Sequence, residues 1–294
     1  MIYISLTTVP LRLVYWDELK TNLDSLMNQK TDKEYYVIFS IPKIYTMNDD
    51  EQYVIPEQLL EYAKEHPKLI INRDTPDYGP IVKIVGAFNY ATNPDDIIIA
   101  LDDDQIYHEE MLEYHVKKLN EHPNEIICFR GDQVVDKREY IDPEDGIKKF
   151  VLRGGHIHFP VNRDIFLLIP GHWHSVGYFR RYFEDDFNEE MWALANGDDI
   201  LIGYYCRLHN ILIRCVRWDG ETDFRPIVDE AGYKPCYTFP IVAPVPMPQS
   251  GGWLIRQKHP KDGNHGYEAK EVQDVLYSYH KHVYIDKDKN FYCG

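Results

Sequence analysis

The sequence predicts an α/β fold with a mostly parallel, Rossmann-like central sheet flanked by helices. Short apolar runs alternate with amphipathic segments through the first hundred residues, in the order β-α-β-α-β-α-β. Residues 97–101 are all apolar, as expected for a central strand that is covered on both faces. Because strands joined through helices pair in parallel with right-handed crossovers, this order indicates a parallel sheet.

Each element of the first hundred residues rests on a local pattern. Strands are expected at residues 2–6, 35–41, 69–71 and 96–101, where apolar residues follow one another. One helix is expected where apolar residues recur at helical spacing within residues 19–27, and Pro56 and Pro80 can each open another. The apolar face of the helix after Pro80 would carry Ile81, Ile84, Val85 and Phe88.

The pattern becomes mixed after residue 104. Helices are expected at residues 109–120 and 199–209, and strands at 126–129, around Phe150, around Phe166, and at 211–216. Residues 240–252 are rich in Pro and Gly and are predicted to form a loop. Since no internal repeat is visible, we expect one domain over residues 1–294. It would comprise a nucleotide-sugar-binding half (1–104), an acceptor-binding half (105–239), and a carboxy-terminal loop or lid with a tail (240–294).

The composition describes a folded, acidic protein. Of 294 residues, 44% are apolar, which is too many for a disordered chain. Acidic residues outnumber basic ones by 48 to 32, so no general affinity for nucleic acid or an anionic membrane is expected. A nucleotide can still bind where a divalent cation offsets the negative field. The acidity therefore favours a metal-dependent protein.

The cysteines and the amino terminus indicate the cellular compartment in which the protein is expected. The five cysteines show no C-x-x-C spacing, which indicates neither a disulfide framework nor a zinc site. Residues 1–6 lack the basic start and long apolar run of a signal peptide, and no apolar stretch reaches the roughly 18 residues of a membrane span. We therefore expect a cytoplasmic protein with no membrane span.

An acidic triplet, Asp102, Asp103 and Asp104, directly follows the apolar run. This places it at the carboxyl end of a central strand, where open α/β sheets bind ligands. Crowded carboxylates repel one another unless a cation lies between them, and Mn²⁺ or Mg²⁺ prefers such oxygen ligands while keeping positions for phosphate. Because residues two apart on an extended segment point the same way, Asp102 and Asp104 are the expected metal ligands. Asp104 would be the direct ligand and Asp102 would lie nearer the ribose or sugar; the alternative is a solvated acidic turn.

Three further segments accompany the triplet: Ser-Leu-Thr-Thr-Val-Pro-Leu-Arg at 5–12, Asp-Tyr-Gly-Pro-Ile-Val-Lys at 77–83, and Asn-Gly-Asp-Asp-Ile at 196–200. With the triplet read as an Asp-x-Asp (DxD) motif, residues 2–216 resemble a subfamily of GT-A glycosyltransferases found in bacteria and large DNA viruses. The resemblance implies metal-dependent transfer of a sugar from a nucleotide sugar, by default a UDP-sugar, onto a saccharide or glycoconjugate acceptor. It implies a role in glycan biosynthesis in the cytoplasm, including that of a virus-infected host cell.

The resemblance also assigns donor-binding residues: Thr7, Thr8, Pro10 and Arg12 in a nucleoside pocket, with Tyr78, Gly79, Lys83, Asp102, Asp103 and Trp173 around the phosphates and sugar. The Thr-Pro segment has the alternative of merely ending a strand. The loop before Pro80 leads into a helix start, where free N–H groups and the helix dipole favour phosphate. Lys83, one turn later, can neutralise diphosphate charge or be a surface lysine. Tyr78 can stack on the base or sugar, or pack in the core.

A second acidic pair, Asp198 and Asp199, precedes an apolar helical segment. By the resemblance, its second carboxylate removes the acceptor proton in inverting enzymes, so Asp199 is the expected base and Asp198 the second candidate. The alternative is that both merely cap the helix.

Histidines supply the remaining candidates. His172 and His174 flank Trp173 and can bind metal or, more consistently with a strand, pack or contact the acceptor. His156 and His158 repeat the spacing without a chemical role. The resemblance also implies a histidine ligand from the carboxy-terminal region, for which His265 between glycines is preferred to His259 before Pro260; a plain surface loop is the alternative.

Two rival functions explain parts of this pattern. A metal-dependent phosphohydrolase or nucleotidyltransferase also uses clustered aspartates, but it does not account for the 77–83 loop and the later acidic pair together. An inactive carbohydrate-binding module is suggested only by the many aromatic residues. A glycosyltransferase accounts for all the motifs.

Overall fold

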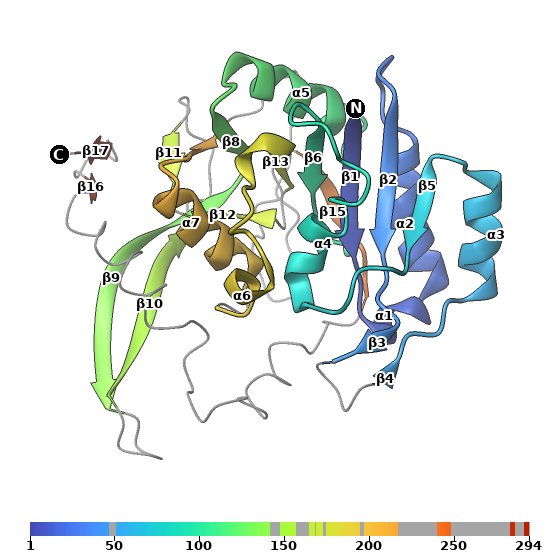
Figure 1. Ribbon diagram of the computed structural model, residues 1–294, viewed down its shortest axis with the longest axis horizontal. Coiled ribbons are helices and arrows are strands. Elements are labelled where there is room, and N and C mark those ends of the chain that lie inside the picture. Colours follow the sequence, from blue (N-terminus) through green and yellow to red (C-terminus); the bar gives the residue numbers. More distant parts are fainter. Residues whose placement is uncertain are drawn as a thin grey trace.

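The computed structural model describes residues 1–46, 51–141, 148–156, 165–167, 169–172, 175–194, 197–216, 240–247, 283–285 and 291–293. A mostly parallel sheet of eight strands runs through these residues, flanked by helices, and confirms the predicted α/β class (Figure 1). The strand order is β11-β14-β8-β13-β6-β1-β2-β5.

The amino-terminal side of the sheet is wholly parallel. Its strands are β1 (Ile2–Thr7), β2 (Tyr35–Ser40), β5 (Leu69–Asn72) and β6 (Ile97–Ala100), and β1 pairs with both β2 and β6. The intervening helices are α1 (Pro10–Leu13), α2 (Trp16–Met27), α3 (Glu57–Glu65), the 3₁₀ turn η1 (Gly79–Ile81) and α4 (Val82–Val85). Because β1 and β6 end at the same edge, residues 7–12 meet residues 101–104 there.

One antiparallel strand joins this side to the remainder of the sheet. β13 (Val176–Phe179) lies antiparallel between β6 and β8 (Glu125–Cys128), and β14 (Leu212–Cys215) follows β8 in parallel. β11 (Ile165–Leu167) forms the edge. Helices α5 (Met111–Glu121) and α7 (Asp198–Leu208), with the short η3 (Arg180–Tyr182) and α6 (Glu189–Trp192), complete this side.

Smaller sheets surround the main one. β9 (Gly131–Ile141) pairs with β10 (Lys148–His156) and β12 (Ile169–Pro170), and the β9–β10 pair extends well away from the main sheet in Figure 1. β7 (Gln105–Tyr107) pairs with β15 (Ile241–Pro244) directly after the acidic triplet. Two short pairs are β3 (Ile44–Tyr45) with β4 (Glu51–Gln52) and β16 (Val283–Ile285) with β17 (Phe291–Cys293).

The structure corrects two expectations. Residues 240–252 are not a loop throughout, because β15 pairs with β7 and a register shift accommodates this Pro-rich segment at a sheet edge. The helix after Pro80 is also shorter than expected: α4 ends at Gly86, and Phe88 lies beyond it, packed against Phe183.

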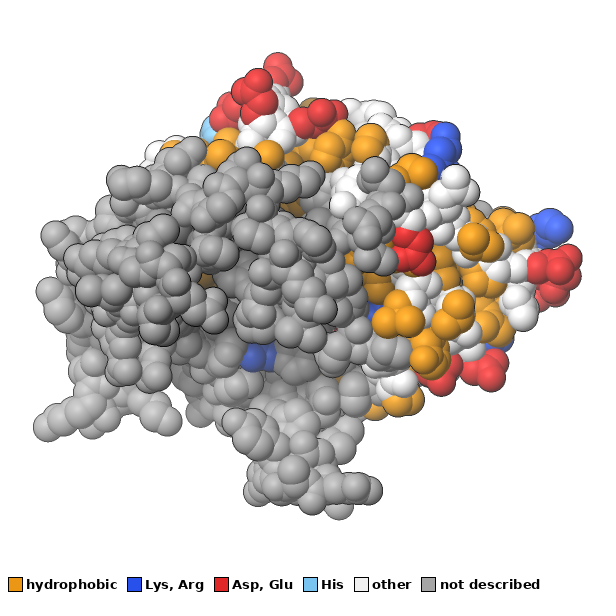
Figure 2. Space-filling view, turned by 90° about the horizontal axis from the view of Figure 1, so that it is seen from below, with side chains coloured by type: hydrophobic (Ala, Val, Ile, Leu, Met, Phe, Trp, Pro, Cys, Tyr) orange, Lys and Arg blue, Asp and Glu red, His pale blue; other side chains and the backbone are white. Residues whose placement is uncertain are grey.

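The described surface mixes apolar and acidic side chains. Figure 2 shows hydrophobic side chains gathered on the side of the molecule where Figure 1 draws the amino-terminal elements, with acidic side chains around them. The exposed apolar residues include Leu11, Val14, Val54 and Leu60. Within the described residues, no helix is long and apolar enough to cross a membrane.

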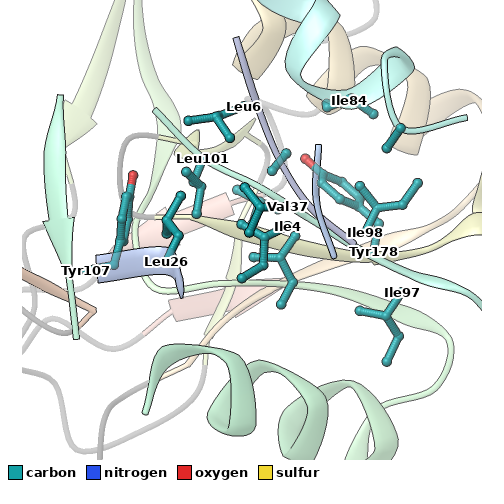
Figure 3. Packing of buried hydrophobic residues seen from close by; sticks show 14 of the residues in the cluster. Ile4, Leu6, Leu26, Val37, Ile84, Ile97, Ile98, Leu101, Tyr107 and Tyr178 are labelled. Atoms are coloured by element: carbon teal, nitrogen blue, oxygen red, sulfur yellow. The ribbon is translucent and has the colours of Figure 1, made fainter. Parts of the chain in front are cut away.

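The hydrophobic core lies on both faces of the sheet. Ile4 and Leu6 on β1, Val37 on β2 and Ile98 on β6 are buried, together with Leu26 of α2 and Ile84 of α4 (Figure 3). Leu101 and Tyr178 belong to the same cluster. Because the last buried residue of the β6 segment is Leu101, the acidic triplet begins where the core ends.

Candidate functional site

The acidic triplet forms a turn rather than an extended segment. The triplet follows the carboxyl end of β6, as expected, but Asp103 and Asp104 lie in a turn before β7, so the expectation of an extended segment is wrong. The middle carboxylate is the buried one, and Thr8 donates a hydrogen bond to it. The side chains of Asp102 and Asp104 remain 29% and 20% exposed, so both stay accessible to a ligand.

Arg12 of α1 holds two members of the triplet. Its guanidinium donates to the Asp103 carboxylate and, at 2.8 Å, to Asp104 Oδ2. Burial raises the pKa of Asp103 to about 6 despite the opposing charge of Arg12, and burial with the nearby Asp102 charge also raises the pKa of Asp104. The triplet is therefore crowded with negative charge that a further cation would relieve.

Lys83 links the triplet to the second acidic pair. It is buried on α4, forms an ion pair with Asp102, and lies 3.0 Å from Asp198 Oδ2. Burial alone would lower the pKa of Lys83, but the charges of Asp102, Asp198 and Asp199 outweigh it and raise that pKa. The ammonium is therefore fixed between two carboxylate groups that lie far apart in the sequence.

Asp198 and Asp199 are the first two residues of α7, where a helix dipole favours negative charge. They differ in exposure: 10% of the Asp198 side chain is accessible, against 40% for Asp199. Although burial disfavours ionisation of Asp198, Lys83 and His172 lower its pKa. Partial burial and the adjacent Asp198 charge raise the pKa of Asp199. Of the two, Asp199 is the more accessible and the stronger base.

His172 contacts both members of the acidic pair. Its Nδ1 forms a hydrogen bond with Asp199 Oδ1 and lies 2.9 Å from Asp198 Oδ2, while its Nε2 contacts the Tyr178 hydroxyl. The imidazole is fully buried, which by itself lowers its pKa, but the two carboxylates raise the pKa to about 9. The ring is therefore an imidazolium at neutral pH.

Comparison with known proteins shows the family to which this chain belongs. The family model described as "Glycosyl transferase family 2" matches residues 9–188. This chain belongs to glycosyl transferase family 2. The match ends before Asp198, so the family model covers the triplet and His172 but not the acidic pair of α7. A search of curated proteins found no significant match.

Two solved structures are also similar to part of this chain. Two crystal structures of S. aureus TarS, one of residues 1–349, match this family 2 chain at 16% identity and a TM-score of 0.34. Each match covers 47% of this chain, and 37% and 22% of the respective TarS chains. The chain thus spans well under half the length of these structures.

Among the described residues of this family 2 chain, three groups have ligand atoms suited to a metal, one of which is the largely exposed set Glu184, Asp186 and His209. Asp102 and Asp104 supply accessible carboxylate oxygens, the type that Mn²⁺ and Mg²⁺ prefer. His172, Asp198 and Asp199 also bring ligand atoms within 4.8 Å of one another. The imidazole of His172, however, is buried, and both of its ring nitrogens already contact Asp199 and the Tyr178 hydroxyl. It has no nitrogen left for a metal, whereas the triplet offers carboxylate oxygens with accessible surface.

The other predicted donor-binding residues that the structure describes lie at the end of β1, in α1 and in the turn before α4. Thr7 donates to the Ser40 carbonyl at 2.8 Å, and Pro10 is the first residue of α1. Tyr78 is partly buried, donates to Glu189 and packs edge-on against Trp192 at 4.9 Å. Gly79 has φ 76°, a left-handed conformation that a glycine adopts without strain. Trp173, His174, His158, His259 and His265 lie outside the described residues, as does the side chain of His156.

Sequence reasoning missed the contacts that join these residues. It assigned Arg12 to the nucleoside and Lys83 to the diphosphate, whereas the structure pairs both with aspartates. It gives His172 no partner, although the His-Trp-His segment is evident in the sequence. The opposite charges of these residues indicate that ion pairs can form between them. Which residues pair depends on the strand order, which the sequence does not show.

Proposed function

We propose that this glycosyltransferase moves a sugar from a nucleoside diphosphate onto a hydroxyl of a saccharide or glycoconjugate, with a divalent cation and inversion at the anomeric carbon. The observation that carries the proposal is the position of Lys83, which contacts Asp102 of the triplet and Asp198 of α7. A metal-binding group and a group able to accept a proton therefore share one site.

Asp102 and Asp104 would hold Mn²⁺ or Mg²⁺. When bound, the ion would stabilise negative charge on the departing diphosphate. Arg12 and Thr8 orient the triplet, because both contact the buried Asp103 and Arg12 also contacts Asp104. The family resemblance implies a third metal ligand from the carboxy-terminal segment, and His265 is our candidate for it.

Asp199 is the base in this proposal and Asp198 is an anchor. Asp198 is nearly buried and lies against two cations, Lys83 and His172, which hold it in the ionised form. Asp199 is four times as exposed, and its raised pKa favours proton uptake. A base needs both properties, because it must reach the acceptor and take its proton.

The proposed reaction is a single displacement. The acceptor oxygen forms a bond to the anomeric carbon while its proton moves to the Asp199 carboxylate. The bond between that carbon and the phosphate oxygen breaks, and its electron pair leaves with the nucleoside diphosphate. Lys83 is fixed beside Asp102, where it adds positive charge near the diphosphate.

The donor pocket would lie along the edge where β1 and β6 end. Thr7, Pro10 and the Tyr78–Gly79 turn lie on the segments that follow β1 and precede α4. Uridine diphosphate sugars are our first choice of donor. The family resemblance assigns Trp173, which lies outside the described residues, to the binding of the donor sugar.

A thermal-shift screen of UDP-, GDP- and dTDP-sugars, each with and without Mn²⁺, tests the proposal. One donor class should raise the melting temperature, and only when metal is present, because binding to the native state stabilises it. Stabilisation by no nucleotide sugar with either Mn²⁺ or Mg²⁺ would refute the proposal.

A further inference from the structure

The Asp199 carboxylate is held through one of its two oxygens. Oδ1 accepts a hydrogen bond from the backbone N–H of His172 at 3.0 Å and another from Nδ1 of the same residue. Among the described residues, no hydrogen bond or ion pair is made to Oδ2. Since 40% of the side chain is exposed, the second oxygen is available for an external hydroxyl.

The imidazole that makes this contact is fixed at its other edge. His172 is 1% exposed, and its Nε2 contacts the hydroxyl of Tyr178. The two rings are stacked with an interplanar angle of 25°. Tyr178 is fully buried on β13 and lies opposite Ile98 of β6, the strand that leads to the acidic triplet. The ring orientation is therefore set by the central sheet.

The chain around His172 is held as well. The N–H of Ser175 donates to the His172 carbonyl at 2.9 Å, and Ser175 has φ 69°. A non-glycine residue rarely adopts this left-handed conformation, which persists only where its surroundings impose it. Here the Ser175 hydroxyl lies 2.8 Å from Nε2 of the buried His115 on α5. The helix and the sheet together fix the turn that carries His172.

We propose that His172 is a positioning residue for the base: it holds Asp199 through Oδ1 so that Oδ2 faces the acceptor hydroxyl. This inference rests on the proposed function. His172 is too deeply buried to touch a substrate, so it acts through Asp199 alone. Its proton stays on the ring throughout, while the acceptor proton moves to Oδ2.

Kinetics of variants test this role, with a panel of UDP-, GDP- and dTDP-hexoses and Mn²⁺ as the probe and release of nucleoside diphosphate as the readout. Asp199→Asn should lower kcat by a factor of about 10²–10⁴, the usual contribution of a general base. His172→Ala should lower kcat by about 10–10² and change the donor KM less than about twofold, because only the orientation of the base is lost.

Two conservative variants separate positioning from folding. His172→Asn should recover part of the lost kcat, since its amide nitrogen can donate from a place close to that of Nδ1. Tyr178→Phe keeps the buried ring but removes the hydroxyl at Nε2, and should lower kcat less than His172→Ala does. His209→Ala is the matched control, because His209 pairs with an exposed carboxylate, Asp186, at the other end of α7.

The decisive comparison is the double variant. Adding His172→Ala to Asp199→Asn should cause no further fall in kcat, because a residue that acts through Asp199 has nothing left to position. If His172→Ala lowers kcat in the Asp199→Asn background by the same factor as in the wild-type background, the inference is overturned. It is also overturned if the single variant His172→Ala keeps the wild-type kcat, or if its donor affinity falls by as large a factor as its kcat. Failure of the wild-type protein to release nucleoside diphosphate from any donor would instead refute the proposed function.

Discussion

At the scale of single residues, the carboxylates of the site differ in exposure, although all five contact Arg12, Lys83 or His172. Asp103 and Asp198 are buried, whereas Asp102, Asp104 and Asp199 keep accessible surface. In the proposed function the buried members orient the site, and the accessible members bind the metal and the acceptor.

Asp104→Ala is expected to abolish the Mn²⁺-dependent part of nucleotide affinity. It removes an accessible oxygen ligand but leaves the buried Asp103 to hold Arg12. Titration calorimetry of UDP, GDP and dTDP with and without Mn²⁺ measures this difference. Asp32→Ala, which removes a 97% exposed carboxylate elsewhere, should keep the wild-type metal dependence. An Asp104→Ala variant with the same dependence would show that the ion binds elsewhere.

His115 is expected to make the protein less stable in mild acid. Burial lowers its pKa to about 3, below the usual 6.5, so the unfolded chain takes up a proton that the folded protein excludes. The contribution of neutral His115 to the free energy of unfolding is fully present above pH 6.5 and is lost as the pH falls toward 3. Between about pH 7 and pH 5, wild type should lose about 2 kcal/mol more unfolding free energy than His115→Gln. Urea titrations at each pH test this, and parallel losses in the two proteins would contradict it.

Sequence reasoning could find these residues but not their partners. Asp102, Asp103 and Asp104 were visible because they follow a buried apolar run, and Asp198 and Asp199 because they precede an apolar helix. The contact of Lys83 with Asp198 and that of His172 with Asp199 join segments that only the folded strand order brings together. Charge and residue type indicate what can pair, and topology decides what does.

At the scale of elements, the site depends on close approach of α4 to the sheet. Gly86 ends this helix beside β2, where an added Cβ would lie 2.0 Å from Ser40 Oγ and 2.7 Å from the Val82 carbonyl oxygen. Lys83 lies on the same short helix, so its position is set by this contact.

Gly86→Ala is therefore expected to destabilise the protein by about 1–3 kcal/mol, the usual cost of overpacking. The φ of Gly86 is −61°, so steric contact rather than backbone conformation is the cause. Urea unfolding should give a lower midpoint with an unchanged slope. Gly197→Ala is the control, because its added Cβ would meet Ile200 at an ordinary 3.6 Å. Equal midpoints for Gly86→Ala and wild type would show that α4 can move away from the sheet.

Elements with a clear apolar run or helical spacing are predicted from the sequence, including the four-residue strands β5, β6, β8 and β14. The same holds for β1, β2, α2 and α7. β13 has four residues and its place between β6 and β8 follows from pairing, not from its own sequence. β15 was predicted as loop because Pro and Gly dominate its surroundings, and its hydrogen bonds come from β7.

At the scale of the whole molecule, net charge and fold act together. A chain with net charge −16 repels a nucleotide diphosphate unless cations gather at one place. The sheet provides that place, because the ends of β1 and β6 bring Arg12, Lys83 and the accessible carboxylates of the triplet together. The fold thus gathers protein cations and a larger number of carboxylates at a single edge, where a metal ion would offset the remaining negative charge.

The identity of the products tests the central claim most directly. Wild-type protein incubated with Mn²⁺ and a panel of UDP-, GDP- and dTDP-hexoses is analysed by mass spectrometry. A glycosyltransferase breaks the bond at the anomeric carbon, so the account predicts a nucleoside diphosphate and a sugar joined to an acceptor or to water. Formation of a nucleoside monophosphate with sugar 1-phosphate would contradict it, because cleavage within the diphosphate is the reaction of a phosphohydrolase.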